Sequence, residues 1–217
     1  EVVRQLVESG ARVANFSRRP ATEHDTVRSW THDVADFRDV PKLFVEATDW
    51  LGGLDLVVWA TGIMPDVGPD EHSPDKDRAT FETNLLGAIA WLDVAADRFL
   101  ATKSGTLVVY GSVAGDRGRR GQPAYNASKA GLHAFAEALR NRLSPHGVTV
   151  TTIKPGPVET PLIAHLGFRN AMPAAEAARR SIRLFTTGKD VYLKFSHRVI
   201  FGIIRLLPTW IMRRLPI

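Results

Sequence analysis

The chain has 217 residues, 44% of them hydrophobic, with a net charge of +5 and no cysteine. This length and composition are typical of one α/β domain with a substantial core, so we expect a single domain over residues 1–217. The absence of cysteine excludes disulfides and thiolate metal sites, and it suits a reducing compartment such as the cytoplasm.

The positive charge lies at one end of the chain. From Arg179 onward there are nine Lys or Arg and one acid, Asp190, a local balance of +8, so the rest of the chain carries −3. Because the main body is slightly acidic and shows no basic stripe with interleaved aromatics, we expect no nucleic-acid partner. The histidines lack metal-ligand spacing, so no metal site is predicted, and His133 is interpreted with the others as structural or superficial.

The predicted elements begin with an amphipathic helix over residues 1–10 and a strand over residues 11–17. Three apolar runs rich in β-branched residues lack alternation, which predicts strands covered on both faces, at residues 54–60, 105–111 and 148–153. Helical patterns lie at residues 37–50, 80–99 and 124–143, and a further short strand is expected near Val191. Strands that alternate with helices at this spacing predict an α/β fold with a single, Rossmann-like, doubly wound parallel sheet.

The first predicted helix begins almost at residue 1. A dinucleotide-binding fold would place its first strand and its glycine-rich, pyrophosphate-binding turn before that helix. We therefore expect an N-terminally truncated sheet that lacks this strand and turn. Such a sheet would have a gap, or a forced re-pairing, between the strands that contain Val13 and Leu56.

The helix expected from residue 124 carries the sequence YNASK, so Tyr125 and Lys129 lie four residues apart on one helical face. An ammonium group beside a phenol stabilises the phenolate, and work near neutrality needs the tyrosine pKa lowered by about 3 units, by a nearby cation and a bound nicotinamide together. On their own, Tyr125 and Lys129 could equally be two exposed residues on the surface of a helix. Ser112 strengthens the case because it follows an apolar strand, where an open parallel sheet places its active-site loops.

The sequences GSVAG, YNASKAGLHAF and IKPGPVET occur in that order. They resemble the short-chain dehydrogenase/reductase family, and so do ETNLLG and HDVAD earlier in the chain. The resemblance implies that Tyr125 is the general acid/base and that Lys129 lowers its pKa and binds the nicotinamide ribose. It also implies that Ser112 orients the carbonyl or alcohol and that Asn84 fixes a water that passes protons from Lys129 to solvent. Asn84 could instead cap or kink its helix.

The resemblance also implies a cofactor site. Its expected residues, besides Tyr125 and Lys129, are Ser17, Arg18, Arg19, Asp33, Val34, Ala60, Gly62, Pro155, Gly156, Val158 and Thr160. Thr160 would hold the carboxamide of the nicotinamide, or serve as a helix N-cap. One departure concerns residues 59–62, which read Trp-Ala-Thr-Gly where the family usually has Asn-Asn-Ala-Gly. The glycine is kept, and Trp59 is interpreted as core packing.

Cofactor choice follows from charge at the end of the strand at residues 11–17. Dehydrogenases for NAD place a carboxylate there to bind the ribose 2′-hydroxyl, whereas this chain has Ser17, Arg18 and Arg19. A guanidinium can bind a 2′-phosphate in a bidentate way and stack on adenine. We therefore expect NADP(H) to be favoured over NAD(H), with a solvated arginine pair as the alternative.

Two features bear on the substrate. Arg117, Arg119 and Arg120 lie between Ser112 and Tyr125, so they could hold an anionic group, although they could equally be exposed or lie at a subunit interface. The basic, apolar segment at residues 195–217 suits a membrane surface, or could close the pocket or pack in an oligomer.

These features together resemble the branch that reduces a polyprenyl-phosphate-linked keto-sugar. We accordingly expect a hydride-transferring oxidoreductase acting on a small-molecule or lipid-linked carbonyl. We expect a homo-oligomer in the cytoplasm, with a peripheral position at the inner face of the membrane as the alternative. An alternative from another class is a non-catalytic NADP-binding sensor.

Overall fold

The computed structural model describes residues 1–19, 25–68 and 70–215. Its strands are β1 Val13–Ser17, β2 Val27–Thr31, β3 Leu56–Trp59, β4 Gly105–Tyr110, β5 Val148–Lys154 and β6 Asp190–Tyr192. Its α-helices are α1 Val2–Glu8, α2 Val40–Leu51, α3 Pro74–Phe81, α4 Gly87–Thr102, α5 Pro123–Leu143, α6 Ala174–Ile182, α7 Phe195–Leu206 and α8 Thr209–Met212. Pro216 and Ile217, at the end of the expected C-terminal segment, lie outside the described residues.

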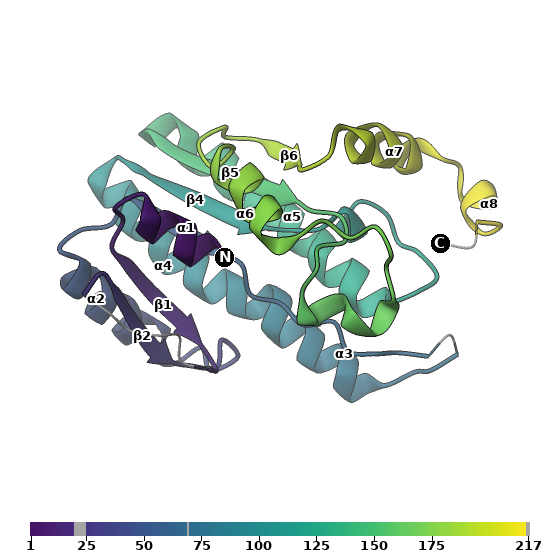
Figure 1. Cartoon of the computed structure of the whole chain (residues 1–217), viewed down its shortest axis with the longest axis horizontal. Coiled ribbons are helices and arrows are strands. Elements are labelled where there is room, and N and C mark those ends of the chain that lie inside the picture. The colour runs from purple at the N-terminus through teal and green to yellow at the C-terminus, as the bar shows by residue number, and fades with distance from the viewer. Residues whose placement is uncertain (20–24, 69, 216–217) are drawn as a thin grey trace.

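The strands form two parallel sheets, as expected for a Rossmann-like fold with a gap. β1 pairs with β2, and the other sheet has the order β3-β4-β5-β6. Within the described ranges no pairing joins β1 to β3, and the two sheets are seen as separate ribbons in Figure 1. The residues of β1 are only half-buried, whereas β5 is almost wholly buried, because β1 has a partner on one side only.

Two apolar clusters cover the two faces of the β3-β4-β5-β6 sheet. The larger one unites α4 and α5 with β4 and β5, with Phe99 and Leu92 fully buried. The smaller one lies on the other face, where α6 contributes Ala177 and α1 contributes the half-buried Val2. α1 packs against α6 and β1, so it lies across the space between the two sheets (Figure 1). This three-layer arrangement confirms the predicted α/β class.

Several boundaries differ from the sequence expectation. The helix expected from residue 37 begins at Val40, because Pro41 suits a first helical turn and Asp39 is the N-cap. The helix expected at residues 80–99 begins earlier, at Pro74 after the N-cap Ser73, and its middle is a π-helical turn, η1, at Glu82–Leu86. β2 and α6 were not predicted. In the described part of the chain, no helix is both long and apolar enough to cross a bilayer.

Candidate active site

Ser112, Tyr125 and Lys129 come together at the carboxyl end of β4. Ser112 lies two residues past β4 and caps the short 3₁₀ helix η2, Val113–Gly115, by accepting a 3.1 Å hydrogen bond from the Ala114 N–H. Tyr125 lies in the first turn of α5 and Lys129 one turn later, and all three side chains are buried. The Ser112 hydroxyl lies beside the Tyr125 phenol and acts to lower its pKa. The sequence-predicted triad is therefore assembled.

Burial is the main influence on the pKa values of both Tyr125 and Lys129. Burial raises the pKa of Tyr125, against the lowering effects of the Ser112 hydrogen bond and of the nearby Arg119 charge. Lys129 lies 6.0 Å from the centre of the Tyr125 ring and donates a 2.9 Å hydrogen bond to the Tyr110 carbonyl oxygen. Burial lowers the pKa of Lys129 to about 8. In this arrangement desolvation outweighs the lowering effects of the neighbouring groups, so the pKa of Tyr125 is raised.

Asn84 lies fully buried in the π-helical turn η1. Its Oδ1 accepts a 2.7 Å hydrogen bond from the Ile63 N–H, and its Nδ2 donates to the Ile63 carbonyl at 2.9 Å and to the Ser128 hydroxyl at 3.2 Å. The side chain therefore ties the loop after β3 to the helix that carries Lys129. A Cβ on Gly62 would lie 3.3 Å from Asn84 Oδ1 and 3.5 Å from Lys129 Nζ, so this glycine allows the close approach of the loop.

A cavity of about 270 Å³ lies between the ends of β1 and β3. It is lined by Ser17, Arg18, Arg19, His32, Asp33, Val34, Thr61, Gly62, Ile63 and Thr83. Six of the expected cofactor residues thus line one cavity, although they come from three separate segments of the chain. The Asp33 carboxylate accepts a hydrogen bond from the Ala35 N–H and so caps its own turn. Ala60 and Trp59 do not line the cavity. Trp59 is buried in the larger cluster, as expected for core packing.

The loop after β5 that contains Pro155 and Gly156, here called the Pro-Gly loop, lies beside the loop that carries Ser112. The Pro155 carbonyl accepts a 3.0 Å hydrogen bond from the Val113 N–H, directly after Ser112. Gly156 packs against His197 of α7 so closely that a Cβ would lie 2.1 Å from Cε1 of that ring. Val158 pairs with Met172 in an isolated bridge. Thr160 is exposed and occupies the N-cap position of a 3₁₀ helix, Pro161–Leu166, without a side-chain capping hydrogen bond.

The three arginines in the loop between Ser112 and Tyr125 have different surroundings. Arg117 donates hydrogen bonds to the carbonyl oxygens of Arg205, at 3.4 Å, and Leu207, at 3.1 Å, and so caps the C-terminus of α7. Arg120 is exposed. Arg119 is half-buried, its Nε has no hydrogen-bond partner among the described residues, and its charge interacts with Tyr125. Of the three, Arg119 is the one whose charge acts on Tyr125 and whose Nε lacks a partner in the described part of the chain.

The profile of the short chain dehydrogenase family matches residues 1–169. The chain belongs to this family. It is 30% identical to an uncharacterized oxidoreductase of Streptomyces coelicolor over 98% of this chain and 89% of that protein. It is 38% identical to an uncharacterized oxidoreductase of Mycobacterium tuberculosis over 61% of this chain, but the match spans only 53% of that relative. An acetoacetyl-CoA reductase of Allochromatium vinosum is 33% identical over 69% of the chain and 61% of that relative.

Solved structures show the same fold. A short-chain dehydrogenase from Burkholderia cenocepacia in complex with NADP has a TM-score of 0.87 and 21% identity, and the match covers 100% of this chain and 91% of that one. ElxO with NADP bound has a TM-score of 0.81 and 16% identity over 91% of this chain and 93% of that one. This likeness supports the Rossmann-like architecture of the short-chain dehydrogenase.

One buried residue beside the short-chain dehydrogenase triad was not predicted. His133 follows Tyr125 and Lys129 at the same helical spacing, and its Nε2 accepts a 3.2 Å hydrogen bond from the Ser112 backbone N–H. The sequence signal was available, because positions four residues apart on a helix share one face. A histidine four residues after Lys129 therefore lies on the helix face that carries Tyr125 and Lys129, near the loop that carries Ser112.

Proposed function

We propose that the protein is an NADP(H)-dependent oxidoreductase that interconverts a carbonyl group and a secondary alcohol, with Tyr125 as the general acid/base. The observation that carries this proposal is the joint burial of Ser112, Tyr125 and Lys129 at the carboxyl end of β4, with Lys129 one helical turn beyond Tyr125. NADP(H), when bound, supplies or takes up the hydride.

The side chains act on the oxygen of the substrate. The Ser112 hydroxyl can donate a hydrogen bond to the carbonyl oxygen, and the Tyr125 phenol can then deliver its proton to that oxygen. Because burial raises the pKa of Tyr125, the tyrosine rests in the protonated form that carbonyl reduction needs. Alcohol oxidation needs the phenolate, which the Lys129 ammonium and the Arg119 guanidinium would stabilise. The resting charge state therefore favours the reductive direction.

The cavity at the end of β1 fits the adenosine part of NADP(H). Arg18 and Arg19 are exposed at its rim, and Gly62 leaves its wall without a side chain. Among the described lining residues the one carboxylate is that of Asp33, which the Ala35 N–H engages. A guanidinium pair without a competing carboxylate at the strand end favours a 2′-phosphate over a 2′-hydroxyl. Two solved structures with this fold hold NADP, in agreement with that choice.

The test compares turnover with binding. The purified enzyme should oxidise NADPH in the presence of a carbonyl substrate, and Tyr125→Phe should lose turnover by about three orders of magnitude or more. NADPH affinity, measured by fluorescence titration, should stay within about twofold of the parent because the ring volume is kept. NADPH binding without turnover of any carbonyl by the parent would instead favour the sensor.

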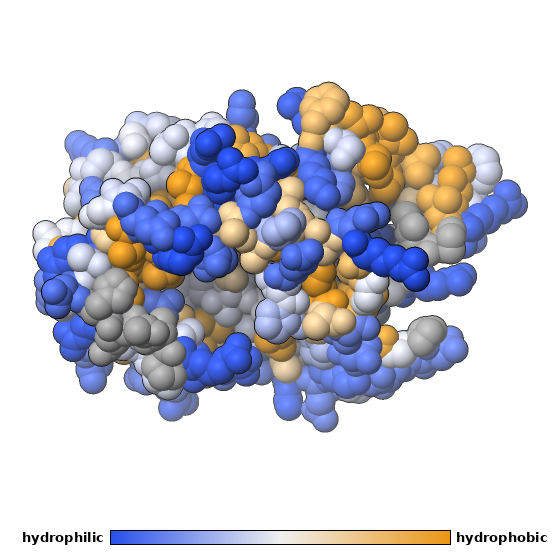
Figure 2. Space-filling model, in the orientation of Figure 1, coloured by the Kyte–Doolittle hydropathy of each residue, from blue (hydrophilic) through white to orange (hydrophobic). Residues whose placement is uncertain are grey.

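A second candidate function concerns where the substrate is presented. The outer face of α7 exposes Phe195, Val199, Ile203 and Leu206, which recur at helical spacing, and Leu206 is 85% exposed. Figure 2 shows apolar residues gathered over this helix. Residues 191–215 carry five Lys or Arg and no acid, so an isologous contact between two copies would oppose like charges. We propose that this face, which we name the α7 face, binds an anionic membrane surface.

The opposite side of helix α7 contacts the candidate active site. Arg117 holds the last turn of α7 against the catalytic loop, and His197 packs on Gly156. A protein docked through this face would hold its active site close to the lipid headgroups. The free donor of Arg119 suits a phosphate on the substrate. Together these contacts favour a lipid-linked carbonyl, such as a polyprenyl-phosphate-linked keto-sugar.

Vesicle flotation tests this second candidate. The protein should float with phosphatidylcholine vesicles that contain phosphatidylglycerol and not with phosphatidylcholine alone. Ile203→Glu and Leu206→Glu should abolish flotation, while Val45→Glu, an equally exposed apolar position on α2, should not. If the α7 face variants instead convert a dimer to a monomer and no vesicle binds the parent, the face is an interface between copies.

A further inference from the structure

Ser112 is held through its backbone by a buried histidine. The Ser112 N–H donates to Nε2 of His133 over 3.2 Å, and both residues are buried. Ser112 is also the residue whose hydroxyl contacts Tyr125. The geometry of the catalytic hydroxyl therefore depends on a ring one turn beyond Lys129 on α5.

Two glycines let the catalytic loop close around this ring. A Cβ on Gly111 would lie 2.2 Å from Nε2 of His133, and a Cβ on Gly115 would lie 2.6 Å from Cε1. Side chains cannot occupy such distances, so the loop from Gly111 to Gly115 fits the imidazole only because both positions lack a Cβ. Ser112 lies between them, and its position is set by packing as well as by the hydrogen bond.

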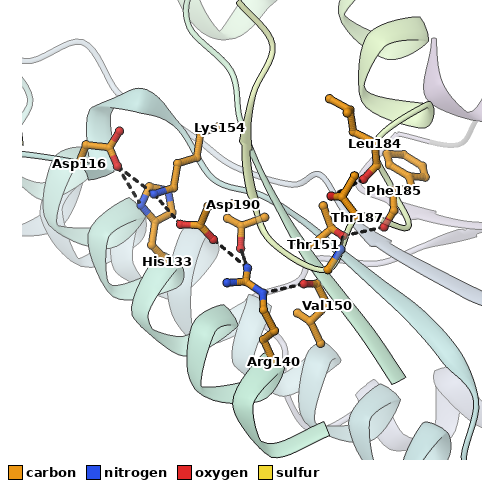
Figure 3. Close-up of polar contacts among 12 residues, drawn as sticks. Asp116, His133, Arg140, Val150, Thr151, Lys154, Leu184, Phe185, Thr187 and Asp190 are labelled. Carbon is orange, nitrogen blue, oxygen red and sulfur yellow. Dashed lines mark hydrogen bonds and ion pairs between the residues drawn. The ribbon is translucent and has the colours of Figure 1, made fainter. Parts of the chain in front are cut away.

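The other ring nitrogen faces a buried charge network (Figure 3). Nδ1 of His133 lies 3.9 Å from Oδ1 of Asp116, which accepts a 2.9 Å hydrogen bond from Lys154. Lys154 also pairs with Asp190 at 2.8 Å, and Asp190 pairs with Arg140 at 2.8 Å. A neutral imidazole with its hydrogen on Nδ1 suits both sides, because the N–H faces the carboxylate and the lone pair of Nε2 faces the Ser112 N–H.

The surroundings keep this ring neutral. The charged groups that face it are Lys154 on β5, Asp116 after η2, Asp190 on β6 and Lys129 on α5. Burial and the Lys154 charge lower the pKa of His133 to about 4, against the opposing effect of the two carboxylates. A protonated ring would direct a second N–H at the Ser112 N–H and break the contact.

We propose that His133 is a positioning residue, whose Nε2 fixes the Ser112 backbone and thereby the hydroxyl that contacts Tyr125. The inference rests on the proposed function, because the position of Ser112 matters for turnover only if Ser112 and Tyr125 act on a carbonyl. It adds a third α5 position to the machinery, one that touches neither substrate nor cofactor. The property of His133 that matters in this proposal is the hydrogen-bond acceptor on Nε2, and not the volume of the ring.

A matched pair of variants separates acceptor from volume. His133→Phe fills the space without an acceptor, whereas the amide oxygen of His133→Gln reaches about the position of Nε2. We expect His133→Phe to lower kcat about 10- to 100-fold with the KM for NADPH within about twofold, and His133→Gln to recover most of kcat. Equal losses in both variants, in kcat and KM together, would overturn the proposal.

The pH profile provides a readout that a purely structural role would not move. The Ser112 hydrogen bond lowers the pKa of Tyr125, so its loss in His133→Phe raises that pKa further. Reduction needs the protonated phenol, so its basic limb should move to higher pH in His133→Phe and not in His133→Gln. An unshifted limb in His133→Phe would count against the proposal.

Nitrogen NMR of the unmodified protein, labelled at histidine, tests the contact even if the variants fail to fold. The proposal requires the His133 signal of a neutral ring with hydrogen on Nδ1 and a hydrogen-bonded lone pair on Nε2. A hydrogen on Nε2 would overturn it regardless of activity. Failure of the proposed function would be seen separately, as turnover retained in Tyr125→Phe, and leaves the tautomer measurement intact.

Discussion

The Lys129 ammonium donates its hydrogen bond, over 2.9 Å, to the carbonyl oxygen of Tyr110, the last residue of β4. The partner is a backbone dipole rather than a carboxylate, and the lysine is buried. A buried cation with such a partner is costly to the folded state, which is why the pKa of Lys129 falls to about 8. The protein thus retains a destabilising group in its candidate active site.

Replacing this lysine should stabilise the fold while removing activity. The folded-state pKa lies below the unfolded value of 10.5, so the penalty is complete below about pH 8 and vanishes as the pH rises to 10.5. We expect Lys129→Met to raise the free energy of unfolding at pH 7 by about 2 kcal/mol, after the loss of one hydrogen bond. Urea unfolding at pH 7 checks this, and a less stable variant would contradict it.

The buried His133 predicts an acid-dependent loss of stability. Its pKa falls from 6.5 to about 4 on folding, so the unfolded state takes up the proton first. Stability should therefore fall by up to about 3 kcal/mol as the pH drops from 6.5 to 4, and level off below. His133→Phe should lose this part of the dependence. Asp190, whose pKa is lowered, acts below pH 3.8 and so in a separate window.

Cofactor discrimination should depend on the arginines at the end of β1. We expect Arg18→Ala combined with Arg19→Ala to raise the KM for NADPH about 10- to 100-fold, because a charge-assisted contact to the 2′-phosphate is lost. The KM for NADH should change less than about twofold. Arg78 is an exposed arginine on α3, away from the end of β1. Arg78→Ala is therefore the control and should change the KM for neither cofactor. Equal losses for both cofactors would refute the discrimination.

Much of the fold could be predicted because the strands beside the site are continuous apolar runs. β3, β4 and β5 fall within the predicted ranges or within one residue of them, since β-branched runs buried on both faces have few alternatives. β2 was missed because its sequence, VRSWT, is short and half polar. α6 was missed because it is only nine residues long and buries small residues, such as Ala177 and Ala178, rather than large apolar ones.

The site was predictable where side chains themselves carry the chemistry. Tyr125, Lys129 and Ser112 have a spacing that survives as a motif, and the structure assembles them. The helical spacing places His133 on the face of Tyr125 and Lys129, but its contact with the Ser112 backbone N–H leaves no mark in a sequence. The role of Arg117 depends on α7, which lies about 90 residues away along the chain. Contacts of both kinds follow from tertiary packing and had to be observed.

The contact between Gly156 and His197 predicts that the Pro-Gly loop and α7 are energetically coupled. A Cβ on Gly156 would lie 2.1 Å from the His197 ring, so Gly156→Ala must displace either the ring or the loop. We expect it to lower the free energy of unfolding by about 1–3 kcal/mol. His197→Ala should relieve the clash, so the double variant should be about as stable as His197→Ala alone, a coupling of about 1–3 kcal/mol. Gly118→Ala, whose Cβ meets nothing within 4 Å, is the matched control and should be neutral. Additive effects in the double-variant cycle would show that the two residues do not touch, because only a shared contact makes the second substitution cancel the first.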